Sequence, residues 1–332
     1  MKTTNSLNKE REIRQFQNMK NYLGKAICEC LDNEDVMEIM INPDSKVFVE
    51  DRKNGMYLLG NIDPHDAVNF VKKAAEVSGR PMGYRNILDT RLPEPVFGRE
   101  RLHADLPPVC GPCPHITLRK PAKYIYPIES YLNKKMITKK QVEAILKAIS
   151  DRCNILTSGG PGTGKTTFTN AIINELPRIS DPMERILILE DVQEIQCQMQ
   201  NVVPLLTDEF GTEPVTMQEL VKSAMRSRPD RIFLGEVRDG AALDMLKAWN
   251  TGTPGGVCTV HSNTAESSLL RIVSLSQEAI QTPPYDLVSE TINVMVNIRR
   301  SSQFEAGRYV HEVSINKGWS NQKQKFEIEQ IA

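Results

Sequence analysis

The feature that most constrains this chain is a glycine-rich segment, Gly159-Gly160-Pro161-Gly162-Thr163-Gly164-Lys165-Thr166, which follows the pattern G-x-x-x-x-G-K-[ST]. An apolar run at residues 154–157 leads into it, and a helical pattern leads out. Glycines let such a loop fold into a nest of backbone N–H groups, and the following helix turns its positive dipole end toward bound phosphate. The segment therefore predicts a nucleotide phosphate site.

The motif also predicts roles for individual residues of the loop. We expect Lys165 to reach the β- and γ-phosphates and the Thr166 hydroxyl to ligate Mg²⁺, so ATP and Mg²⁺ are the expected cofactors. A chance match in a chain of this length is on the order of 1 in 100, and the flanking strand and helix lower it further. The predicted nucleotide-binding residues are Gly159, Gly160, Pro161, Gly162, Thr163, Gly164, Lys165, Thr166 and Thr167.

Strand-like and helical runs alternate from residue 154 onward. The strand-like runs are residues 154–157, 186–189, 231–235 and 256–260, and the later helical runs are 217–226, 240–249 and 266–278. Alternation of this kind is typical of a mostly parallel sheet covered on both faces. The fold class predicted is α/β, with a C-terminal RecA-like P-loop domain.

The first part of the chain has a different pattern. A helical run at residues 9–31 precedes short strand-like runs at 36–41, 46–50 and 56–59, and a second helical run covers 66–77. We therefore expect a small α+β domain over residues 1–119. A linker containing Pro121 and Pro127 is expected over 120–136, and the ATPase domain over 137–332.

Acidic residues follow two of the buried-type strands. Residues 186–189 lead to Glu190 and Asp191, with Glu194 shortly after, and residues 231–235 lead to Glu236. Parallel sheets place ligands at the carboxyl ends of their strands. Hydrolysis needs one carboxylate for the magnesium shell and another to orient or deprotonate water. Each acid taken alone is equally well explained as a solvated strand end, and the phosphate loop favours the functional interpretation.

His261 follows the strand-like run 256–260 and falls at the same expected edge. There it could hydrogen-bond the γ-phosphate and register its loss. A capping or core histidine is the commoner role for such a residue taken alone, and the sequence leaves both interpretations open.

Four segments in order resemble signatures of the secretion ATPase superfamily, which drives type II and type IV secretion and type IV pili. They are the phosphate loop, an acidic box at 189–194, a Walker B segment at 228–238 ending in Gly-Glu-Val-Arg, and a histidine box at 255–263. Segments 98–104 and 116–120 resemble strands of the family's N-terminal domain, so the resemblance covers roughly residues 35–300. Residues 247–252 are most similar to the conjugative-transfer (TrbB-like) branch.

The resemblance implies a homohexameric ring that holds nucleotide between its two domains and works with inner-membrane components of a conjugation or type IV secretion channel. It also implies that Glu190 orients the attacking water, that Glu236 acts through the magnesium shell, and that Arg101 and Arg119 neutralise charge on the γ-phosphate. One departure is Thr253, which stands where the family usually has a histidine.

Other functions remain as alternatives. A type IV pilus or type II secretion motor belongs to the same superfamily, although many type II motors are longer and carry a four-cysteine zinc insertion. A DNA-processing RecA-like ATPase is disfavoured because the formal net charge is −1, so we expect no direct specific nucleic-acid binding. A non-hydrolysing nucleotide switch is disfavoured by the paired acids.

Composition also bears on location. The first 20 residues have no apolar signal region, and no apolar run approaches the ~20 residues that span a bilayer. The seven cysteines are scattered, which is typical of reduced thiols. We expect a cytoplasmic protein without a transmembrane segment, which meets the inner face of the membrane through a partner.

Cys110-Gly111-Pro112-Cys113 spells a dithiol motif, but prolines crowd it and a strand follows. A redox site needs its first cysteine at a helix N-terminus. A zinc site would have to add His103 or His115 and matches known ligand spacings only loosely. We therefore expect a hairpin loop here.

Overall fold

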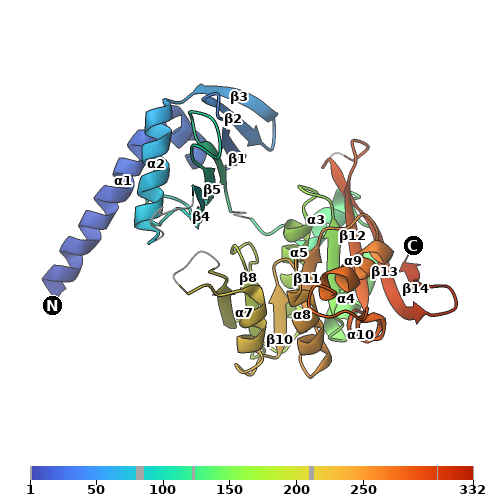
Figure 1. Ribbon diagram of the computed structural model, residues 1–332. Helices are drawn as coiled ribbons and strands as arrows, with labels where there is room; N and C mark the ends of the chain where they lie inside the picture. Colours follow the sequence, from blue (N-terminus) through green and yellow to red (C-terminus); the bar gives the residue numbers. More distant parts are fainter. Residues whose placement is uncertain (1, 80–85, 122–123, 209–212, 305, 332) are drawn as a thin grey trace. The chain divides into compact units, whose positions relative to one another are not determined.

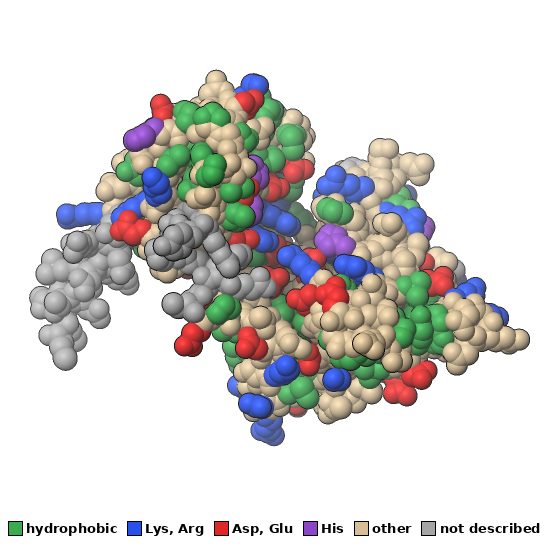
Figure 2. All heavy atoms as spheres, viewed as in Figure 1, with side chains coloured by type: hydrophobic (Ala, Val, Ile, Leu, Met, Phe, Trp, Pro, Cys, Tyr) green, Lys and Arg blue, Asp and Glu red, His purple; other side chains and the backbone are tan. Residues whose placement is uncertain are grey.

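The computed structural model describes residues 2–79, 86–121, 124–208, 213–304 and 306–331 (Figure 1). The chain divides into two compact units, Met1–Lys123 and Tyr124–Ala332, called here the N-terminal and C-terminal units. On the face drawn in Figure 2, acidic and basic side chains are interspersed on each unit, in keeping with 42 acidic and 41 basic residues in the chain.

The N-terminal unit is a six-stranded antiparallel sheet in the order β3-β2-β1-β6-β5-β4, with two helices. The helices α1 and α2 pack on one face of the sheet and bury side chains such as Leu23 and Phe70 against Ile39 and Leu118. The elements are α1 (Lys2–Asp32), β1 (Val36–Ile41), β2 (Lys46–Asp51), β3 (Gly55–Asn61), α2 (Pro64–Val77), β4 (Ile87–Arg91), β5 (Arg101–Asp105) and β6 (His115–Arg119).

Helix α1 matches the helical run expected at residues 9–31 but contains a break. Gly24 adopts φ 75° and ψ 167°, which is outside the helical region, so two helical segments meet there. Leu23, Ile27 and Leu31 are nevertheless buried, as their spacing predicts. Periodicity reports which side chains face the core and is insensitive to a single glycine kink.

Alternation along β5 and β6 divides their side chains between two faces. Leu102, Ala104, Ile116 and Leu118 are fully buried beneath the helices. The intervening residues lie on the opposite face, where they are partly or fully exposed. This second face is where polar residues of the unit gather.

The C-terminal unit contains an eight-stranded sheet in the order β14-β13-β12-β7-β11-β10-β8-β9. The strands from β12 to β9 pair in parallel, and β13 and β14 add an antiparallel edge. Its strands are β7 (Ile155–Gly159), β8 (Arg185–Glu190), β9 (Asn201–Leu206), β10 (Arg231–Leu234), β11 (Val257–Val260), β12 (Val294–Arg300), β13 (Arg308–Ser320) and β14 (Lys325–Ile331).

Helices cover both faces of this sheet, as two separate apolar cores demonstrate. One face carries α3 (Ile128–Asn133), α4 (Lys139–Ser150), α5 (Lys165–Ile173) and α6 (Leu176–Ile179). The other carries α7 (Met217–Ala224), α8 (Ala241–Asn250), α9 (Ala265–Ser276) and α10 (Tyr285–Thr291). The predicted α/β class with a mostly parallel sheet, preceded by an α+β unit, is confirmed.

Both tryptophans of the chain belong to the C-terminal unit. Trp249 on α8 is 2% exposed and donates its indole N–H to the carbonyl of Ile232 at 3.0 Å. Trp319 on β13 stacks on Tyr285 of α10, with ring centroids 3.7 Å apart. These contacts fasten two helices of one face to the sheet.

The segment expected as a linker is shorter than residues 120–136. Helix α3 lies inside it, and its Ile128 and Tyr131 are buried in the core of the C-terminal unit. A six-residue helix shows too few turns for its periodicity to be recognised in the sequence.

Among the described residues, none of the helices is both long and apolar enough to cross a lipid bilayer.

Candidate active site

The glycine-rich segment forms the turn between β7 and α5. Strand β7 is buried along its length and lies between β11 and β12, with which it pairs in parallel. Helix α5 begins at Lys165, directly after Gly164. The loop therefore lies at the carboxyl edge of a central strand, with a helix N-terminus beside it, as the sequence predicts.

Two glycines of the loop have left-handed backbone angles, φ 65° at Gly162 and φ 91° at Gly164. A Cβ at Gly162 would meet Arg300 Nη2 at 2.2 Å, and one at Gly164 would meet Arg308 Nη1 at 2.6 Å. The backbone angles favour glycine at both positions, because other residues adopt them only with strain. Main-chain groups are thereby left uncovered at these two positions, which fits a phosphate cradle.

Arg300 and Arg308 were not among the predicted site residues. They face each other across the β12–β13 pair, and Arg300 Nε donates a hydrogen bond to the carbonyl of Gly162 at 3.2 Å. Their proximity to the loop depends on the pairing of β12 with β7, about 140 residues apart in sequence. No local motif marks them, so only the fold reveals two additional cations at the loop.

Lys165 is almost completely buried, with 7% of its surface exposed. Its Nζ donates to the carbonyls of Gly159 and Gly160, at 3.1 and 3.3 Å. The same Nζ lies 3.1 Å from Nδ1 of His261. The lysine that the motif assigns to phosphate is therefore held against the carbonyls of the loop, at the carboxyl end of β7.

His261 connects Lys165 to Glu236. Its Nε2 lies 3.2 Å from Glu236 Oε1, while its Nδ1 faces the lysine. Because the ammonium group can only donate, Nδ1 accepts, and the Nε2–H donates to the carboxylate. Partial burial of the ring and the charge of Lys165 lower the pKa of His261, which favours this neutral form.

Glu236 is also bound by Arg238, two residues further along the chain. Arg238 Nε lies 3.0 Å from Oε1 and its Nη2 lies 3.3 Å from Oε2, a two-pronged ion pair. A further nitrogen, Nη1, lies 3.7 Å from Asp191 Oδ2. Arg238 is the last residue of the Walker B segment, and the structure places it between the acids that follow β8 and β10.

Glu190 has a different environment from Glu236. It is 1% exposed, and its Oε1 accepts hydrogen bonds from the backbone N–H groups of Glu194 and Ile195, both at 2.8 Å. A Cβ at Gly235 would meet its Cγ at 2.9 Å. The carboxylate thus closes the turn after β8, which carries the half-buried Asp191 and Glu194.

Comparison with known proteins identifies the family. Residues 23–315 match the family described as "Type II/IV secretion system protein".

The chain belongs to this family of secretion proteins.

Two relatives show the same affiliation over nearly the whole chain. The "Conjugal transfer protein TrbB" of Rhizobium radiobacter is 42% identical over 93% of this chain and 92% of its own length. The "Probable conjugal transfer protein TrbB" of Sinorhizobium fredii is 39% identical, covering 96% and 94%. The resemblance predicted from the four motifs, including its TrbB-like character, is therefore confirmed.

A solved structure shows the same fold. The "Pilus Retraction Motor PilT and Bound ADP" superposes with a TM-score of 0.65 at 20% identity, covering 87% of this chain and 80% of that chain.

The two arginines expected to act on the γ-phosphate of this secretion protein lie in its N-terminal unit. Arg101 on β5 and Arg119 on β6 are directly opposite each other on the polar face of the sheet. Arg101 is held by Asp89, with Nη2–Oδ2 at 3.0 Å and Nε–Oδ1 at 3.3 Å. Arg119, at the end of β6, is exposed.

The departure at Thr253 also has a structural counterpart in this family member. Its Oγ1 donates to the carbonyl of Ala248 at 2.6 Å, close to the end of α8. In this chain the position therefore caps a helix terminus.

The dithiol motif lies in the loop between β5 and β6, which confirms the expected hairpin. Cys113 is fully buried, and burial raises the pKa of its thiol. Cys110 donates through Sγ to the carbonyl of Asp105 at 3.0 Å. All seven cysteines are free thiols, and the raised pKa of Cys113 is the opposite of the lowered pKa of a redox-active cysteine.

Proposed function

We propose that this chain is a Mg²⁺-dependent ATPase that powers conjugative transfer or type IV secretion. The observation that carries the proposal is the chain of contacts Lys165–His261–Glu236, which joins the phosphate loop to the carboxyl ends of β10 and β11. The two TrbB relatives, which are conjugal transfer proteins by name, support the same function.

Each residue at this edge then has a specific task. Main-chain N–H groups of residues 159–167 other than Pro161 bind the phosphates, and Lys165 leaves its loop carbonyls to contact the β- and γ-phosphates. Thr166, through its hydroxyl, and Glu236, through a water, would hold Mg²⁺, which would supply positive charge to neutralise the phosphates.

The neutral His261 relays the state of the phosphate. Its Nδ1 loses its donor when Lys165 moves to nucleotide, so the imidazole can turn away from Glu236 and toward the γ-phosphate. That makes His261 sensitive to whether the γ-phosphate is present.

Glu190 is proposed to orient the attacking water. Glu190 is buried and accepts two backbone hydrogen bonds, so it fixes the turn at 191–195. In this way it would orient the water through the position of Asp191 and Glu194, which the turn carries. Arg300 and Arg308 add positive charge at the loop, where the charge of a triphosphate has to be balanced.

Assembly and partners extend the same proposal. We propose a homohexamer in the cytoplasm, which contacts inner-membrane components of the secretion channel. Arg101 and Arg119 supply guanidinium groups to the γ-phosphate. Their common face on β5 and β6 supports a joint role.

The test is phosphate release by the purified chain with ATP and Mg²⁺. Lys165→Ala should abolish turnover, because the described loop contains no second ammonium group. Lys147→Ala, a change at an exposed lysine of α4, serves as the matched control and should retain full activity. Turnover of Lys165→Ala equal to that of the control would refute the assignment.

A further inference from the structure

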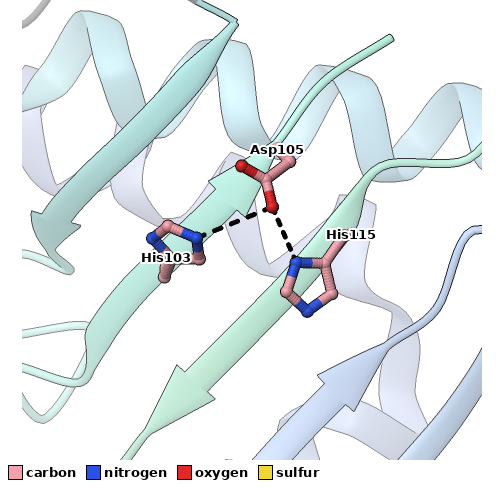
Figure 3. Close-up of side chains that lie close together, drawn as sticks. All are labelled: His103, Asp105 and His115. Carbon is pink, nitrogen blue, oxygen red and sulfur yellow. Dashed lines mark hydrogen bonds and ion pairs between the residues drawn. The ribbon is translucent and has the colours of Figure 1, made fainter. Parts of the chain in front are cut away.

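A separate group of side chains, His103, Asp105 and His115, lies on the polar face of the N-terminal unit (Figure 3). In the antiparallel pairing of β5 with β6, Asp105 is directly opposite His115. His103 precedes Asp105 by two residues and so points to the same face. The register of two hydrogen-bonded strands, rather than a flexible loop, brings the three together.

The carboxylate of Asp105 is the meeting point. Its Oδ2 lies 2.9 Å from Nδ1 of His115 and 3.6 Å from Nε2 of His103. Figure 3 shows both rings directed at this same oxygen. One ligand atom from each of the three side chains lies within 4.8 Å of the other two.

The other nitrogen of each ring also has a neighbour. His103 Nδ1 lies 3.8 Å from Asp89 Oδ2, and His115 Nε2 lies 3.4 Å from Thr117 Oγ1. A metal-ligating histidine ordinarily directs its second N–H to a carboxylate or another acceptor, which fixes the ring and its tautomer. Both rings thus present one nitrogen to the centre and the other to a supporting oxygen.

We propose that His103, Asp105 and His115 form a binding site for a divalent transition metal ion such as Zn²⁺. Two imidazoles and one carboxylate are a preferred donor set for Zn²⁺, whereas Mg²⁺ prefers oxygen alone. The fourth position is left to water, since the three side chains are 38%, 22% and 37% exposed, in sequence order.

The distances match the size of such an ion. With Zn–N and Zn–O bonds of about 2.0–2.2 Å, two ligand atoms of a tetrahedral site are about 3.3 Å apart. The observed separations of 2.9 and 3.6 Å lie on either side of that value. Binding replaces the contact between His115 Nδ1 and Asp105 Oδ2, so it needs only small side-chain rotations.

Sulfur does not belong to this ligand set. The Cys110 thiol is engaged with backbone carbonyls, and Cys113 is fully buried. The proposed site is therefore distinct from a site built on the dithiol motif. It predicts nitrogen and oxygen ligation, which a spectrum can distinguish from thiolate ligation.

The experiment is a titration of the full-length chain, free of any histidine tag, with Co²⁺ as a coloured probe and with Zn²⁺ as its competitor. We expect one ion per chain at this site, with the visible absorption of four- or five-coordinate Co²⁺. We expect no thiolate-to-metal band in the near ultraviolet. Zn²⁺ should bleach the visible band.

Three variants remove one ligand each: His103→Ala, Asp105→Asn and His115→Ala. Loss of a supporting residue alone weakens metal binding about 10–100-fold, so loss of a ligand should weaken it by more than about 100-fold. His65→Ala, on the exposed side of α2, is the matched control. His261→Ala controls for metal held by the His261–Glu236 pair. Both controls should bind like the wild type.

Three outcomes would overturn the proposal. These are a wild-type chain that binds neither ion, ligand variants that bind like the wild type, and a Co²⁺ spectrum dominated by thiolate bands. The wild-type spectrum decides independently of the variants, so a variant that fails to fold does not block the test. Circular dichroism verifies the fold of each variant.

Discussion

The two polar sites of this chain are built in opposite ways. In the C-terminal unit Lys165 and Glu190 are buried at the ends of parallel strands, 7% and 1% exposed, and backbone groups fix them. In the N-terminal unit Arg101, His103 and Arg119 stand on the open face of an antiparallel sheet. In the first site main-chain groups hold the two buried charges, and in the second site side chains on a sheet surface hold one another.

This contrast predicts which amino-acid substitutions the fold tolerates. A buried charge that loses its partner keeps the full cost of desolvation, whereas an exposed charge is screened by water. We therefore expect substitutions in the C-terminal unit to affect folding and chemistry together. Substitutions on the open face should affect chemistry or ligand binding and leave folding unchanged.

The largest expected effect tests the open face. Arg119→Ala should lower ATP turnover by about 10³–10⁵-fold, the range observed where a guanidinium stabilises phosphoryl transfer. Arg101→Ala should lower it less, because Asp89 already holds that guanidinium in two hydrogen bonds. Steady-state phosphate release measures both, with light scattering to establish the oligomeric state.

The thermal midpoint should be nearly unchanged in Arg119→Ala, since the side chain is exposed. Full turnover in this variant, with wild-type assembly, would mean that the open face takes no part in hydrolysis. The proposed contribution of the N-terminal unit to the γ-phosphate would then be abandoned.

The second effect separates the two buried-strand acids. Glu236→Gln should retain nucleotide binding and lose at least about 100-fold in turnover, the low end for acid–base catalysis. Glu190→Gln should lose turnover by a similar factor and also melt at lower temperature. The neutral amide oxygen is a weaker acceptor for the two backbone N–H groups at 194 and 195.

Phosphate release and calorimetry on the same samples give both quantities. Glu194→Gln, on the turn that Glu190 closes, is the matched comparison. If Glu190→Gln alters the melting temperature but leaves turnover intact, Glu190 is structural, and the water is oriented by another acid of the turn.

The smallest effect concerns pH. The pKa of His261 is lowered in the folded chain, so between that value and the ordinary histidine pKa of about 6.5 the unfolded chain binds more protons. The free energy of unfolding should therefore fall as pH drops below about 6.5. Urea titrations at a series of pH values measure the slope, which should be shallower in His261→Ala. An identical slope in both proteins would contradict the neutral tautomer assigned to His261.

The sequence predicts the strands, helices and site residues of the C-terminal unit that depend on local patterns. The strands β7, β8, β10 and β11 were predicted to within about two residues, because buried parallel strands are continuous apolar runs. Helices α4, α7 and α9 begin at threonine capping boxes, which are local signals. The phosphate loop, Lys165 and the acids after β8 and β10 follow from such local patterns.

Other parts depend on contacts that a sequence does not display. Strands β12 and β13 bury polar residues such as Asn297 and Ser314, which interrupt the apolar pattern. Strand β9 carries Pro204, which disfavours a strand prediction but is tolerated at the edge of the sheet. Arg300 and Arg308 reach the loop only through strand pairing, and the neighbours of His103 depend on the register of β5 with β6.

The placement of the two indoles gives the molecule an optical asymmetry. Trp249 and Trp319 both report on the C-terminal unit, and the N-terminal unit contains no tryptophan. Tryptophan fluorescence, excited at the red edge of the absorption band, therefore reports on the C-terminal unit alone. Far-ultraviolet circular dichroism reports on both units. Denaturation curves that diverge between the two signals would resolve the stabilities of the two units without any label, where a single two-state fit would average them.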